Sequence, residues 1–205
     1  MKFRYAPLAL ACALMMAGSA HAASVTVNFN DLAHNYSYAP NVASPYVSDG
    51  FEFTDTCRAP TACFYVWGRN TLLQADTENA ALAVAFQETT TTVKQVNGEN
   101  FDLHSIDLAD AYNDGANTSF VFTFVSSGGS TQETVTLDSF RGLQTVVFNK
   151  TQLTEFSFAE TTGMIYSAQF DNVVLNAAAV PEPGTYALML AGLAASGLTA
   201  KRRKT

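Results

Sequence analysis

The chain has 205 residues, with 11 Lys and Arg against 18 Asp and Glu, and a formal net charge of −7. This length is enough for one domain with its own core. An acidic chain without a basic patch is a poor partner for nucleic acid, because the phosphates repel its surface. We therefore expect no nucleic-acid partner.

Residues 1–22 have the pattern of a secretory signal peptide. Lys2 and Arg4 precede an apolar core at 6–17, and Ala20 and Ala22 are the small residues of a signal peptidase site. We expect export through the Sec translocon and cleavage by signal peptidase near Ala23. Without both chain ends, five Lys and Arg oppose 17 Asp and Glu, so the exported domain carries a formal charge of −12.

Residues 23–178 are predicted to form one all-β domain. Apolar alternation or β-branched runs occur at 25–29, 51–54, 63–67, 81–86, 91–96, 105–108, 120–125, 134–137, 145–148, 154–158 and 169–175. Turn-forming residues separate these runs, and no helical period is present. The pattern predicts an antiparallel β-sandwich. Phe120, Phe122 and Phe124 share one strand face and should be core, and 127–130 should turn this strand into a hairpin.

The exported domain has two cysteines, Cys57 and Cys63. In an oxidising periplasm this spacing predicts a disulfide that closes a small loop. Free or metal-bound thiols are the alternative. Two cysteines alone are too few ligands for a structural zinc site.

The C-terminal residues 179–205 combine three features. Pro181, Glu182 and Pro183 are followed by an uncharged apolar run at 185–200. The basic residues Lys201, Arg202, Arg203 and Lys204 come next. A helix from 183 to 200 would be roughly 27 Å long, just enough for a thin bilayer, and the cations should stay on the cytoplasmic side. These features predict a single transmembrane helix, with a buried core helix as the alternative.

The same C-terminal pattern resembles the PEP-CTERM sorting signal of exported Gram-negative bacterial proteins. The resemblance implies that an exosortase recognises Pro181, Glu182 and Pro183 and processes the tail. It implies transient anchoring in the inner membrane, then placement at the outer surface or outside the cell. It also implies a role with exopolysaccharide and biofilm.

Four short motifs, at 28–32, 100–108, 111–115 and 169–175, resemble jelly-roll domains akin to galactose-binding and carbohydrate-binding sandwiches. In such sandwiches the first and last strands can hold a structural calcium. The resemblance therefore implies Asp31 and Asp171 as calcium ligands. The alternative is that Asp31 caps a loop and Asp171 ends a surface strand.

Aromatic side chains in the expected loops suggest glycan stacking. They are Tyr36, Tyr38, Tyr46, Tyr65, Trp67 and Tyr112. We take Tyr65 and Trp67 as the glycan-binding candidates, with core packing of Trp67 against the disulfide as the alternative. No Gly-x-Ser-x-Gly or His-Glu-x-x-His motif is present, and we assign no catalytic residue. We expect a non-catalytic surface or matrix protein, with a cell-surface carbohydrate-binding module as the main alternative and a secreted glycan-active enzyme as the other.

Overall fold

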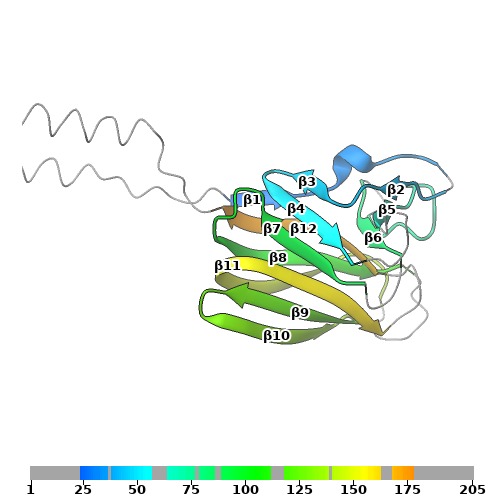
Figure 1. The fold of residues 1–205 in the computed structure, drawn as a ribbon. Helices are drawn as coiled ribbons and strands as arrows, with labels where there is room; N and C mark the ends of the chain where they lie inside the picture. Colours follow the sequence, from blue (N-terminus) through cyan, green and yellow to red (C-terminus); the bar gives the residue numbers. More distant parts are fainter. Residues whose placement is uncertain are drawn as a thin grey trace, which may run out of the picture. The chain divides into compact units, whose positions relative to one another are not determined.

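The computed structural model describes residues 24–177 except 37, 57–63, 77–78, 86–88, 112–117, 139 and 163–167. These residues form a β-sheet protein with one short 3-10 helix (Figure 1). The elements are β1 (Ser24–Val27), η1 (Asn30–Leu32), β2 (Asn41–Val42), β3 (Tyr46–Ser48), β4 (Phe51–Asp55), β5 (Phe64–Val66), β6 (Leu82–Val84), β7 (Thr91–Gln95), β8 (Phe101–Asp110), β9 (Ser119–Ser126), β10 (Gly129–Thr136), β11 (Gln144–Thr162) and β12 (Ala168–Ala177). Every strand pairing is antiparallel, which confirms the predicted all-β antiparallel sandwich.

The long strand β11 belongs to both layers of the sandwich. Its first half pairs with β8, and its second half pairs with β7 and β9. Between the halves the register shifts twice, and Asn149 and Gln152 have φ values of 51° and 56°. This left-handed backbone bends the strand without ending it. The sequence predicted two separate strands here, at 145–148 and 154–158, and the structure joins them.

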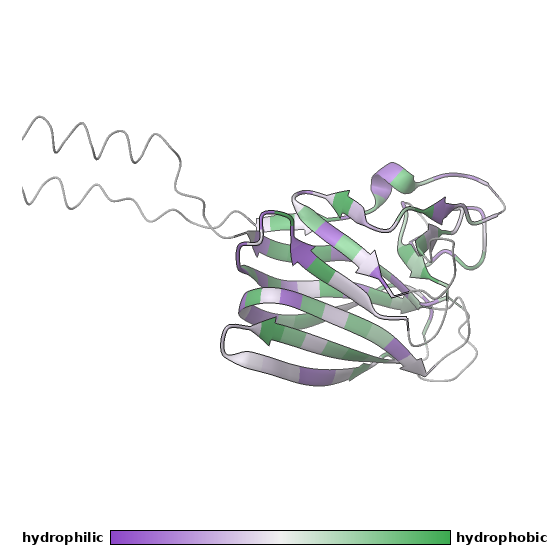
Figure 2. Ribbon diagram, viewed as in Figure 1, coloured by the Kyte–Doolittle hydropathy of each residue, from purple (hydrophilic) through white to green (hydrophobic). Residues whose placement is uncertain are grey.

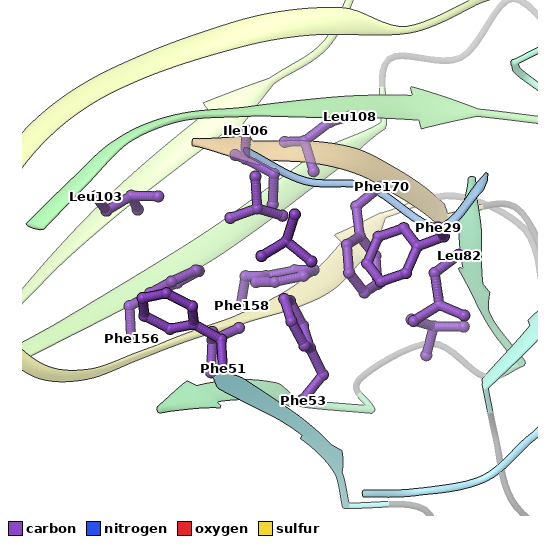
Figure 3. Packing of buried hydrophobic residues seen from close by; sticks show 14 of the residues in the cluster. Phe29, Phe51, Phe53, Leu82, Leu103, Ile106, Leu108, Phe156, Phe158 and Phe170 are labelled. Carbon is purple, nitrogen blue, oxygen red and sulfur yellow. The ribbon is translucent and has the colours of Figure 1, made fainter. Parts of the chain in front are cut away.

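Apolar residues of both layers meet in a core rich in phenylalanine (Figure 3). Phe170 of β12 lies 5.3 Å from Phe29 and 5.0 Å from Phe158 of β11 between ring centroids, in edge-to-face contacts. Such pairs add about 0.5–1.5 kcal/mol each to the gain from burial. The core therefore ties the segment after β1 to strands of both layers.

Hydrophobic and hydrophilic residues alternate along several strands (Figure 2), and in β4, β7 and β9 buried residues alternate with less buried ones. Phe120, Phe122 and Phe124 of β9 are all buried, as their spacing predicted. Gly129 of β10 pairs with Ser126 of β9, which confirms the predicted hairpin. The short strands β2 and β3 were not predicted, because two or three residues are too few for an alternation pattern.

The two ends of the described domain lie side by side. Ser24 of β1 pairs with Asn176 of β12. At the opposite end of β12, Gln169 and Phe170 pair with β6, which leads through β5 to β2. The loop before β2 therefore lies at the end of the domain away from the chain ends (Figure 1).

Candidate functional site

The loop between η1 and β2 is fastened to the turn that follows β5. The backbone N–H of Arg69 donates to the His34 carbonyl at 2.9 Å, and the Asn70 side-chain amide donates to the Asn35 carbonyl at 3.4 Å. β2 then pairs with β5 itself. These hydrogen bonds fix a segment that lies outside the strands.

Gly68 lets the turn after β5 approach the loop between η1 and β2 closely, because glycine has no side chain. A Cβ at position 68 would lie 1.8 Å from the backbone carbonyl oxygen of Tyr36. That separation is far below van der Waals contact, so a side chain here would push the loop away. The position of Tyr36 therefore depends on a glycine at 68.

The imidazole of His34 is hydrogen-bonded at both nitrogens. The backbone N–H of Tyr36 donates to Nδ1 at 3.1 Å, and Nε2 lies 3.1 Å from the carbonyl oxygen of Val66. Because Nδ1 accepts, Nε2 must carry the proton and donate to that carbonyl. The ring therefore has one tautomer and one orientation, and it links the loop to β5.

His34, Tyr36 and Tyr38 gather their rings into a cluster that we call the aromatic step. The Tyr36 centroid lies 4.9 Å from that of His34, at 30°, and 5.1 Å from that of Tyr38, at 9°. The His34 and Tyr38 centroids are 6.5 Å apart, so the rings do not form a straight column. The three centroids form a triangle in which Tyr36 is the ring nearest to both of the others. Tyr36 and Tyr38 are still 55% and 59% exposed.

The aromatic step can bind a flat, weakly polar surface. The face of an aromatic ring carries partial negative charge and attracts the C–H groups of a ligand. The same two segments also carry exposed polar side chains, those of Asn35, Arg69 and Asn70. Many ligand-binding sites combine aromatic side chains, on which a ligand can stack, with a small number of polar groups nearby.

The sequence candidates Tyr65 and Trp67 lie on β5 and directly after it. Tyr65 is only 4% exposed, and its hydroxyl donates to the Val84 carbonyl at 3.4 Å. Trp67 is partly buried and meets the Tyr65 ring edge-on, with centroids 5.5 Å apart. Tyr65 therefore has no open face for a sugar, which corrects its prediction as a stacking residue. Trp67 stays a prediction, whereas the side chains of Tyr36 and Tyr38 are more than half exposed. The alternation of His34, Tyr36 and Tyr38 was the signal that could have found the site, because alternate residues of an extended segment share a side.

Asp31, one of the two predicted calcium ligands, lies exposed on η1. Its Oδ1 accepts a hydrogen bond from the Tyr46 hydroxyl at 3.0 Å. Burial, together with this hydrogen bond, raises the pKa of Tyr46 to about 12. The phenol therefore stays protonated and ties η1 to β3.

Asp171, the other predicted ligand, is buried in β12. It is 1% exposed, and its Oδ1 has no hydrogen-bond partner among the described residues. Burial is the main reason that the pKa of its carboxyl is raised to about 7. The carboxylates of Asp76 and Asp107 add to the rise, whereas hydrogen bonds from the backbone N–H groups of Phe29 and Asn172 oppose it.

These two aspartates fit a calcium ion unequally. Calcium takes six to eight oxygen ligands, and the unpartnered oxygen of Asp171 suits one of them. Asp31 already uses Oδ1 for Tyr46. Within the described ranges, no group of three or more His, Cys, Asp or Glu side chains is placed to hold a metal ion. Calcium at Asp171 stays a prediction, and backbone carbonyls or amides would have to supply most other ligands.

Several predicted features fall outside the described residues. They are the signal peptidase site at Ala20 and Ala22, the Cys57–Cys63 disulfide, the sorting residues 181–183, the transmembrane helix and the basic residues 201–204. Among the helices that the structure does describe, none is long and apolar enough to cross a membrane.

Comparison with known protein families identifies the C-terminal segment. Residues 179–204 match the PEP-CTERM protein-sorting motif. The match confirms the sorting signal that the sequence predicted, and it indicates a secreted protein that is sorted to the cell envelope and processed by an exosortase. No curated protein sequence matches the chain.

Solved structures similar to this chain include three carbohydrate-binding modules. The family 32 module of C. perfringens NanJ, in complex with galactose, is 13% identical, with 62% of this chain and 94% of that one covered and a TM-score of 0.39. CBM32-3 from a family 31 glycoside hydrolase of Clostridium perfringens is 17% identical, with 62% of this chain and 90% of that one covered and a TM-score of 0.38. CBM32 of AlyQ, in complex with 4,5-unsaturated mannuronic acid, is 13% identical, covering 62% and 94%, with a TM-score of 0.38. Similarity at this level concerns the fold and assigns no ligand to this chain.

Proposed function

We propose that the protein is a surface or matrix component whose β-sandwich binds glycan, without catalysis, through the aromatic step. The observation that carries the proposal is the pair Tyr36 and Tyr38. Both side chains are more than half exposed, yet their rings are nearly parallel on a backbone fixed by Gly68 and His34. Pyranose rings present C–H groups on their faces, which suit such a surface.

The position of the aromatic step in the domain supports this proposal. The chain leaves β12 at Ala177, next to Ser24, and the step lies toward the other end of that strand. Ten residues of β-strand span roughly 33 Å. A domain attached through its C-terminal side would therefore have its glycan site at the far end, where an extended polymer can reach it.

The extracellular polymer that we propose as partner is exopolysaccharide of the matrix. The sorting motif brings the protein to the envelope, where such polymers are assembled. Binding through two stacked tyrosines would be weak for one site. Each aromatic contact contributes about 0.5–1.5 kcal/mol, so a polymer with many repeats would gain from several bound copies.

Affinity electrophoresis tests the proposed glycan binding. The full chain, in mild detergent, is run through a series of gels, each of which contains one polysaccharide. Retention by at least one polymer is expected. The double variant Tyr36→Ala/Tyr38→Ala should lose about tenfold or more in affinity, from two contacts of about 1 kcal/mol each. Phe140→Ala is the matched control, because Phe140 is 76% exposed on another turn.

Three results would contradict the proposal. Equal retention of the double variant and the control would remove the aromatic step as the site. New reducing ends released from a retained polymer would favour the secreted glycan-active enzyme over a binding module. Absence of retention on every polymer would leave the protein without the proposed ligand class.

A further inference from the structure

Positively charged side chains are scarce among the described residues, and half of them form ion pairs with glutamates. The cationic side chains among the described residues are Arg69, Lys94, Arg141 and Lys150. Lys94 pairs with Glu155 at 2.8 Å, and Lys150 pairs with Glu133. Arg69 takes part in no ion pair within the described part of the chain, although the exported domain carries a formal charge of −12.

Arg69 lies beside the aromatic step. Its backbone N–H donates to the His34 carbonyl at 2.9 Å, and its neighbour Gly68 touches the backbone of Tyr36. Its side chain is exposed. The backbone of Arg69 is therefore fixed against the same segment that carries the rings, and its long side chain remains available to a ligand.

We propose that the aromatic step takes a glycan that carries carboxylates, with Arg69 pairing with a carboxylate while the sugar ring stacks on Tyr36 or Tyr38. This inference rests on the proposed glycan-binding function and names its ligand class. A guanidinium offers a planar fork of donors that matches a carboxylate. At physiological salt, charges beyond about 8 Å are largely screened, so acidic side chains farther away than that oppose an approaching carboxylate only weakly.

The test uses two polymers with the same sugar backbone. Polygalacturonate carries free carboxylates, and its fully methyl-esterified form carries none. Binding of the full chain in mild detergent is measured by affinity electrophoresis for wild type, Arg69→Gln, Arg141→Gln and Tyr36→Ala/Tyr38→Ala. Arg141→Gln is the matched control, because it removes, from a different turn, the other arginine that forms no ion pair among the described residues.

We expect wild type and Arg141→Gln to bind polygalacturonate about fivefold more tightly than the ester, the upper range for an exposed ion pair. Arg69→Gln should bind both polymers alike, at the level of the ester. The double variant Tyr36→Ala/Tyr38→Ala should lose binding to both polymers. Equal binding of the two polymers by wild type, or a preference that survives Arg69→Gln, would overturn the acidic ligand class while glycan binding still stands. Retention of neutral glycans alone, such as dextran or galactan, would likewise overturn it and keep the proposed function.

Discussion

Replacing Asp171 with asparagine should remove a pH dependence from the stability of the domain. The carboxyl is 1% exposed, and burial raises its pKa from 3.8 to about 7. The folded protein therefore holds this proton more tightly than the unfolded chain does. Between about pH 4 and pH 7 the folded state binds more protons, so stability falls as pH rises. The contribution is fully present below about pH 4 and is lost through pH 7.

The size of this effect follows from the two pKa values. A difference of about three pKa units corresponds to at most about 4 kcal/mol. Domains of this size are stable by about 5–15 kcal/mol, so the change is large enough to measure. Asparagine keeps an oxygen for the backbone donors, but its amide nitrogen would be buried without a known acceptor. We therefore compare the slope of stability with pH between wild type and variant, and not their absolute stabilities.

Urea denaturation from pH 4 to pH 8 measures this slope, followed by the fluorescence of Trp67, the only tryptophan. Asp49→Asn is the control, because Asp49 lies exposed on a turn with φ 50°, a conformation that asparagine tolerates. The control should keep the wild-type slope, and Asp171→Asn should flatten it. Identical slopes in wild type and Asp171→Asn would refute the argument from burial.

The same experiment with calcium at pH 8 tests the predicted metal ligand. An ion that binds the ionised Asp171 should restore stability, by about 2.7 kcal/mol at 100 times its dissociation constant. The gain should be absent in Asp171→Asn. A wild-type midpoint that calcium and chelator leave unchanged would exclude calcium at this site.

Two further variants address the support of the aromatic step and the sorting signal. Gly68→Ala should cost more than about 1 kcal/mol and weaken glycan retention, because its Cβ would collide with the Tyr36 carbonyl; unchanged melting and retention would contradict this. Glu182→Ala should leave a longer, membrane-retained form on an immunoblot, because the exosortase would no longer read the motif. Unchanged size and location would show that Glu182 is not needed for sorting.

Local pattern was enough to predict the fold class. Phe120, Phe122 and Phe124 alternate along one strand, and the residues after them favour a turn, so both core and hairpin followed from neighbouring residues. The path of β11 could not be predicted from local pattern, because its bend at Asn149 and Gln152 depends on pairing with β8 in one layer and β9 in the other. Such pairings join residues far apart in the sequence.

The sequence did not indicate which of the aromatic side chains are exposed. Tyr65 belongs to a run of apolar residues, and β6 and its neighbours cover it. The burial of Tyr65 depends on its pairing with β6, which is distant in the sequence, so the residues around Tyr65 do not show that it is buried while Tyr36 and Tyr38 stay exposed. Asp31 and Asp171 were predicted as calcium ligands, and that role stays a prediction. The hydrogen bond from Tyr46 to Asp31 could not be predicted, because it depends on β3, which the sequence did not indicate.

The aromatic step is better explained by binding than by folding. Two tyrosine rings that stay more than half exposed add little to the core, which already holds the neighbouring Tyr65. Yet three features hold the segment that carries these rings in one arrangement. They are Gly68, which has no space for a side chain, His34, whose two ring nitrogens are both hydrogen-bonded, and the backbone hydrogen bond from Arg69. Ordering side chains lowers their entropy, and these two rings recover only part of that cost through burial. A ligand that covered the rings would supply the missing burial, and this is the physical reason to propose binding at this site.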